Sequence, residues 1–180
     1  VIPDLTNPLF PPIVRGIEDV LTPAGFSALI VNTDNDLDRE ERQVESLRSR
    51  QVEGLIIATA RREHPLLARL HRQGVRMVLV NRRVDGLDLP SVTADDDAGI
   101  GMAVTHLAGL GHRRIAHLAG PQMTSTGVVR ARAFRHAIRD HGLDDDPSLT
   151  VECGYWSEAE GAAALRRLLD SGADFTAVVA

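Results

Sequence analysis

The sequence has no lysine, one cysteine and few aromatic residues, and each scarcity excludes a class of protein. Twenty of its 180 residues are basic, and all of these are arginine. A chain without lysine cannot carry the phosphate-binding loop GxxxxGK[ST]. Cys153 alone can form neither an internal disulfide nor a cysteine metal cluster. Because Cys153 lies in an apolar run, we expect a buried thiol in a reducing compartment.

Long apolar runs and excess positive charge are also absent. No run approaches the roughly 18–20 apolar residues of a membrane span, and no signal peptide opens the sequence. We therefore expect no membrane partner and a cytoplasmic location. The formal net charge of -5 argues against a nucleic-acid-binding surface within this segment.

Short apolar runs rich in β-branched residues recur along the chain, as is typical of strands buried on both faces of parallel sheets. The predicted strands are residues 1–3, 28–31, 55–58, 77–80, 91–93, 115–119, 150–153 and 176–180. Between them, apolar residues recur at helical spacing, as in Ile13, Ile17 and Leu21.

Capping pairs and glycines predict where the helices begin and end. Asp38 with Glu41, and Ser157 with Glu160, have capping-box spacing. A terminating glycine follows each of five helical patterns, at Gly25, Gly74, Gly111, Gly142 and Gly172. This alternation predicts an α/β doubly wound fold. The turn-rich segment 82–99 predicts a boundary between two lobes, residues 1–96 and residues 97–180.

Ligands of open parallel sheets bind beyond the carboxyl ends of the strands, so the residues that follow each strand are candidate ligand contacts. These residues are Phe10, Asn81, Arg82, Asp95, Thr124, Thr126, Arg130 and Trp156. Rings that stack on a ligand, together with amide, hydroxyl and guanidinium groups, suit a small polyhydroxylated or heterocyclic molecule. We expect Arg130 in the first turn of a helix and as the anchor of the ligand, because a cation there is unfavourable unless it has an anionic or oxygen-rich partner.

All of these candidates except Arg82 also have a purely structural alternative. These are core packing for Phe10, a turn for Asn81, a helix cap for Asp95, loop hydroxyls for Thr124 and Thr126, a surface position for Arg130 and a hydrophobic staple for Trp156.

Motifs of catalysis and metal binding are missing. The segment DAGIGMAV has Val104 where a dinucleotide-binding loop needs its third glycine. No G-x-S-x-G elbow occurs, and the seven histidines lack companions at metal-ligand spacing. We expect no catalytic residue, no metal and no cofactor.

Four segments resemble the effector-binding region of the lac repressor family of bacterial transcription regulators. They are VIPDLTNPLFPPIVRGIEDVLTPAGFSALIVNTDND, RQVEGLIIA, MVLVNRRVDGLDLPSVTADDDAG and HLAGLGHRRIAHLAGP, of which the last is the most specific. The resemblance implies two lobes of the type I periplasmic-binding-protein kind, with a small effector between them. It also implies a homodimer that binds operator DNA through a helix-turn-helix domain. Carried over by position, the implied effector contacts are Leu9, Phe10, Asn81, Arg82, Thr124, Thr126, Arg130 and Trp156.

The sequence departs from the family pattern at both ends. No helix-turn-helix precedes Val1, and the chain stops at TAVVA, so we expect an internal fragment with an incomplete second lobe. Its last apolar strand would expose an unpaired edge and favour association.

Three functions remain open at this point. The first is a ligand-sensing domain that binds a sugar, sugar phosphate or purine-like effector and modulates operator binding. The second is a periplasmic sugar-binding protein of a transporter, which shares the fold. The third is an α/β enzyme, which would need a catalytic base or nucleophile that the sequence does not reveal.

Overall fold

Parallel strands with helices on both faces build each of two units. The computed structural model describes residues 1–180, and they divide into unit 1, Val1–Val92, and unit 2, Thr93–Ala180. The expected α/β doubly wound class is confirmed.

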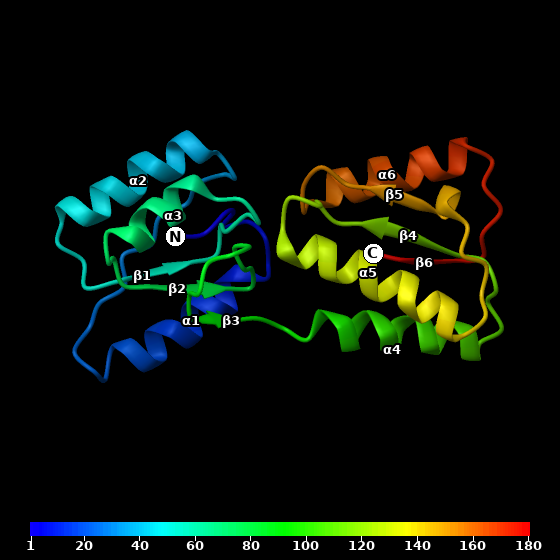
Figure 1. Ribbon diagram of the computed structural model, residues 1–180, viewed down its shortest axis with the longest axis horizontal. Helices are drawn as coiled ribbons and strands as arrows, with labels where there is room; N and C mark the ends of the chain where they lie inside the picture. The colour runs from blue at the N-terminus through cyan, green and yellow to red at the C-terminus, as the bar shows by residue number, and fades with distance from the viewer. The chain divides into compact units, whose positions relative to one another are not determined.

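Unit 1 contains three helices and a sheet in which β1, β2 and β3 are neighbours in that order and all parallel. Its elements are α1 (Phe10–Leu21), α2 (Leu37–Ser49), β1 (Leu55–Ile57), α3 (Pro65–Arg72), β2 (Met77–Val80) and β3 (Ser91–Val92). Helices α2 and α3 cover one face of the sheet and α1 lies on the other (Figure 1). The core between the sheet and the two helices is aliphatic, with Val44, Leu67 and Ile57 fully buried.

The first residues of the chain extend this sheet beyond β1. The backbone N–H of Val1 donates to the Ile56 carbonyl at 2.8 Å, and Ala58 N–H donates to the Val1 carbonyl at 2.9 Å. Ile2 in turn forms an isolated parallel bridge with Asn32. The segments around residues 32 and 2 therefore precede β1, β2 and β3 in the order of a doubly wound sheet.

The strand predicted at 28–31 is not formed, and only its neighbour Asn32 pairs. Leu29 and Ile30 are 50% and 44% exposed rather than buried on both faces. The physical reason is that no strand runs between these residues and β1, where an open groove lies instead. An apolar run therefore marks an extended segment here, without the hydrogen-bonded neighbours that complete a strand.

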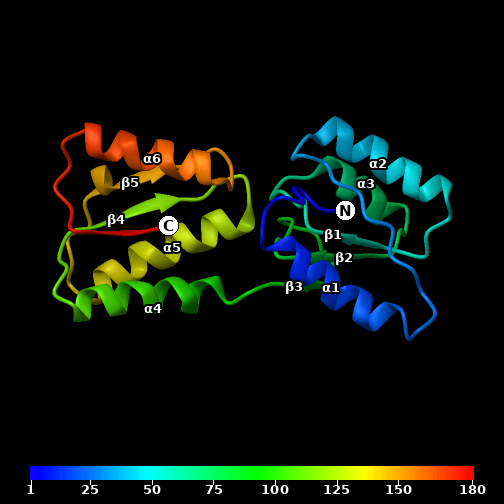
Figure 2. The same cartoon turned by 180° about the vertical axis from the view of Figure 1, so that it is seen from behind.

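Unit 2 repeats the layered arrangement with β4 in the middle of the order β5, β4, β6, again all parallel. Its elements are α4 (Asp96–Gly109), β4 (Ile115–Ala119), α5 (Ser125–Asp140), β5 (Thr150–Glu152), α6 (Glu158–Asp170) and β6 (Ala177–Val179), with a short 3-10 turn at Pro147–Leu149. Helix α6 lies on one face, and α4 and α5 pack together on the other (Figure 2). All five residues of β4 are buried, as predicted for a central strand.

Most predicted helix boundaries are confirmed. All five terminating glycines have positive φ, and the Ser157 hydroxyl caps α6 by accepting from the Glu160 N–H at 3.2 Å. The cap predicted at Asp38 is wrong, because α2 begins earlier: the Asp36 carboxylate accepts from Arg39 N–H at 2.7 Å. None of the helices is both long and apolar enough to cross a membrane.

Candidate functional site

The loop after β4 is held rigidly by its own backbone and hydroxyl groups. Thr124 caps α5: its hydroxyl accepts from Gly127 N–H at 3.2 Å and donates to the Pro121 carbonyl at 2.8 Å. The Thr126 hydroxyl donates to Thr124 Oγ1 at 3.2 Å. Both threonines are buried, so their hydroxyls shape the loop from within.

Gly127 allows this loop to close tightly. A Cβ atom at position 127 would lie 2.1 Å from the Pro121 carbonyl oxygen, a distance that no side chain could tolerate. The glycine thus lets the first turn of α5 approach the chain leaving β4. The start of α5 is thereby fixed relative to the end of the strand.

The prediction that Arg130 lies in the first turn of its helix is wrong: α5 begins at Ser125, which places Arg130 in the second turn. The positive end of the helix dipole therefore acts only weakly on Arg130, since the effect of the dipole fades within the first turn. Its Nε instead donates to Asp96 Oδ1 at 2.7 Å, from the first residue of α4. The Asp96 side chain is only 10% exposed and that of Arg130 is 30% exposed, so this is a partly buried pair with one accessible member.

Trp156 completes this corner of unit 2. The register of β4 with β5 pairs Ala119 with Glu152, so the loops that follow the two strands leave the sheet side by side. The guanidinium carbon of Arg130 lies 4.9 Å from the centroid of the Trp156 ring, within cation–π distance. The ring packs on Gly120, where a Cβ would come within 2.0 Å of it. Unit 2 therefore gathers Arg130, a half-buried tryptophan and a rigid loop at the carboxyl ends of two strands.

Unit 1 places Asn81 and Arg82 at the carboxyl end of β2. Asn81 adopts a left-handed conformation with φ of 67°, and its N–H donates to the Val92 carbonyl at 2.8 Å. This turn directs the chain so that Arg82 is 5% exposed, with its Nε lacking any hydrogen-bond partner. Burial, and secondarily the nearby Arg61, lowers the pKa of Arg82 to about 10, while Glu40 opposes the shift. Arg82 remains a cation at neutral pH.

A buried carboxylate provides the countercharge for Arg82. Glu40 of α2 is 2% exposed; it accepts from the Thr59 hydroxyl, and its Oε2 lies 3.5 Å from His64 Nε2. His64 Nδ1 accepts from Arg61 N–H at 3.2 Å, and its Nε2, which faces Glu40, has no hydrogen-bond partner. Glu40 thus accepts one hydrogen bond, from Thr59, and acts electrostatically on Arg82.

The remaining predicted site residues have separate roles in the local structure. Leu9 is 46% exposed and immediately precedes α1, whereas Phe10 is 2% exposed and packs with Ile2 and Ala58. The Asp95 carboxylate caps α4 by accepting from Ala98 N–H at 3.0 Å.

Two carboxylates that the sequence analysis did not select are central to these arrangements. Asp96 was passed over in favour of its neighbour Asp95, and nothing local distinguishes the two. Glu40 did carry a signal: it shares one face of α2 with buried Val44 and Leu47, four and seven residues on. A carboxylate on an apolar helix face calls for a buried partner.

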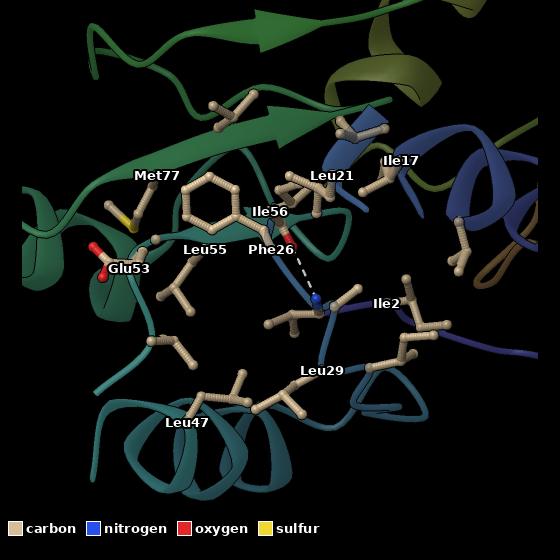
Figure 3. Close-up of a pocket in the computed structure, with 18 of the residues that line it drawn as sticks. Ile2, Ile17, Leu21, Phe26, Leu29, Leu47, Glu53, Leu55, Ile56 and Met77 are labelled. Atoms are coloured by element: carbon tan, nitrogen blue, oxygen red, sulfur yellow. Dashed lines mark hydrogen bonds between the residues drawn. The ribbon is translucent and has the colours of Figure 1, made fainter. Parts of the chain in front are cut away.

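Unit 1 also has an apolar groove that runs along α1 and reaches the first residues of β1 and β2. It encloses about 620 Å³ between α1, the segment at residues 25–30 and the first residues of β1 and β2. Figure 3 shows Phe26, Leu29 and Leu55 among its lining side chains. The lining is mostly aliphatic and offers few converging polar groups, which a hydroxylated ligand would need. The groove is therefore a poor candidate for a polar ligand.

Two doubly wound units with polar and aromatic side chains at the carboxyl ends of their strands define a ligand-binding domain of the periplasmic-binding-protein type. The chain belongs to the family described as periplasmic binding proteins and sugar binding domain of the LacI family, whose model matches residues 1–180. The resemblance noted from the four sequence segments is confirmed.

Similar proteins of known role are transcription regulators. The HTH-type transcriptional regulator DegA of Bacillus subtilis is 30% identical over 176 residues, covering 96% of this chain and 52% of DegA. The HTH-type transcriptional repressor CytR of Escherichia coli is 29% identical over 178 residues, covering 99% of this chain and 52% of CytR. The chain thus spans about half the length of these relatives.

A solved relative has a similar fold with a sugar bound. The complex of the transcriptional regulator CelR with cellobiose superposes with a TM-score of 0.84 at 30% identity, covering 98% of this chain and 56% of CelR.

Proposed function

We propose that this chain is the effector-sensing part of a bacterial transcription regulator, in which a small hydroxyl-rich molecule binds between two lobes, residues 1–96 and 97–180. The observation that carries the proposal is the accessible guanidinium of Arg130, held by Asp96 and lying over the Trp156 ring. A planar fork of donors beside an aromatic face is suited to the hydroxyls and ring of a sugar. The cellobiose complex of CelR supports a sugar as the effector.

Some residues at the strand ends would contact the effector, and others would hold those residues in position. Arg130 and Trp156 would contact the effector directly, and Thr124 and Thr126 would keep their loop in position. From the first lobe, Leu9, Asn81 and Arg82 would contribute to the site, with Phe10 fixing the start of α1. Asp95 would act through the position of α4, since its carboxylate already caps that helix.

The regulatory step would be a shift between two arrangements of the lobes. Such a shift requires that the effector bind one arrangement more tightly than the other. A DNA-binding domain outside this chain would read the change at an operator in the cytoplasm, with the protein acting as a homodimer. The regulator names of DegA and CytR support this role over transport and catalysis. No cofactor is needed for it.

Thermal stabilisation of the full-length protein by a panel of sugars, sugar phosphates, nucleosides and purines tests the proposal. A ligand that binds only the folded state raises the melting temperature with increasing concentration. We expect a hit that is lost in Arg130→Ala and in Trp156→Ala. The matched control is Arg132→Ala on the same helix, whose side chain is 69% exposed and pairs with Asp97. A hit that survives Arg130→Ala would refute the assigned site.

A further inference from the structure

The charge on Arg130 is already compensated within unit 2. Its Nε is occupied by Asp96 Oδ1 at 2.7 Å, and the Asp96 side chain is 10% exposed. An arginine meant to hold a phosphate would present its full charge and bidentate edge to the ligand. Here one donor of that edge is taken, and a carboxylate lies beside any group that binds the Nη nitrogens.

Arg82 of unit 1 does not supply the missing positive charge. Only 5% of it is exposed, and Glu40 lies close enough to act on its electrostatics. Its neighbour Arg61 is directed to the Asn35 carbonyl, to which an Nη donates at 2.8 Å. Each unit therefore places a carboxylate of its own near its arginine, which is buried in unit 1 and accessible in unit 2.

We propose that Asp96 is a charge filter that selects an uncharged, hydroxyl-rich ring over its phosphorylated counterpart. The inference rests on the proposed function and narrows its ligand class. Hydroxyl oxygens can accept from the free Nη nitrogens while the Asp96 pair stays intact. A phosphate dianion at the same place would face the Asp96 carboxylate across a partly buried site, where like charges repel more strongly than in water.

Matched ligand pairs test the filter directly. Binding of glucose and glucose 6-phosphate, fructose and fructose 1-phosphate, and galactose and galactose 1-phosphate is measured by calorimetry on the full-length wild-type protein. For a sugar that binds, we expect the affinity of the neutral form to be at least tenfold higher than that of its phosphate ester. In Asp96→Asn, which keeps the size of the side chain but removes its charge, we expect this ratio to fall at least fivefold. Asp97→Asn is the matched control, since its exposed pair with Arg132 is 3.4 Å long and outside the site.

The outcomes separate the two levels of the proposal. A phosphate ester that binds the wild type more tightly than the neutral sugar overturns the filter and leaves the sensing function intact. Equal ratios in wild type and in a folded Asp96→Asn variant overturn it as well. Binding of neither class, with no other member of the thermal panel bound, refutes the proposed function itself. The wild-type ratio decides alone if Asp96→Asn fails to fold.

Discussion

The two units each bury one histidine, in opposite electrostatic surroundings. In unit 1, His64 lies 3.5 Å from a carboxylate oxygen of Glu40, and both side chains are almost fully buried. In unit 2, His117 stacks on Phe134 with ring centroids 4.4 Å apart, and its Nδ1 has no hydrogen-bond partner. One ring nitrogen of each histidine has no hydrogen-bond partner, but unit 1 places its histidine beside a carboxylate, whereas unit 2 stacks a neutral histidine on an aromatic ring.

The arginines at the strand ends differ in the same way. Arg82 of unit 1 is buried beside the Glu40 cluster, and Arg130 of unit 2 is accessible with one carboxylate partner. The same layered fold thus buries an arginine in one unit and leaves an arginine accessible to solvent in the other. The difference separates a buried arginine, whose charge is balanced inside unit 1, from an arginine whose side chain is partly open to solvent.

The largest expected effect comes from removing the carboxylate of the unit 1 cluster. In Glu40→Ala, buried Arg82 loses its countercharge and the Thr59 hydroxyl loses its acceptor, so we expect the free energy of unfolding to fall by about 3–5 kcal/mol. Denaturant unfolding followed by circular dichroism measures it. Glu41→Ala, which breaks an exposed pair with Arg69 one residue along, should cost less than about 1 kcal/mol. Equal losses of unfolding free energy in the two variants would show that the buried carboxylate stabilises the fold no more than an exposed one.

Acid should act on unit 2 through His117. Burial, and secondarily Arg135 and Arg130, lowers the pKa of His117 to about 4 from an unfolded value of 6.5. Between these two pH values the unfolded chain binds more protons, so stability falls as the pH is lowered. The loss reaches roughly 3 kcal/mol once both states are protonated.

Comparing the wild type with His117→Gln isolates this contribution. The variant cannot take up the proton, so its unfolding free energy should decline less between pH 6.5 and pH 4. Parallel pH curves for the two proteins would mean that His117 is not the group responsible.

Local signals predicted the layered fold because they depend on short stretches of chain. Apolar runs marked β4 and β2, and Gly111 and Gly142 ended helices in the left-handed conformation that other residues avoid. The run at 28–31 failed because strand formation needs a hydrogen-bonded neighbour, which local sequence does not report.

Only part of the candidate site could be predicted, because local sequence does not report which distant residues become neighbours. Arg130 and Trp156 were found because each follows a strand, and the topology brings such loops together. The pairing of Arg130 with Asp96 joins the starts of two helices separated by a strand, and three consecutive aspartates offered no way to choose among them. Glu40 was detectable only by asking why a carboxylate shares a face with aliphatic residues.

The smallest expected effect comes from a substitution that tests what holds the Trp156 ring over the accessible Arg130. In Gly120→Ala the new Cβ would lie 2.0 Å from the Trp156 ring, so the ring must move off Arg130. Such overpacking costs about 1–3 kcal/mol. Because Trp156 is the single tryptophan, its fluorescence reports the change: we expect red-shifted emission, easier quenching by acrylamide and weaker effector binding.

Gly99→Ala is the matched control for this change, because a Cβ at that position on α4 meets nothing within 4 Å. It should leave the emission unchanged and stabilise the helix by about 0.5–1 kcal/mol. If Gly120→Ala also leaves the emission unchanged, the ring is positioned by the capped start of α6 rather than by the loop after β4. The ring would then stay over Arg130 in the variant, and the affinity for the effector should match that of the wild type.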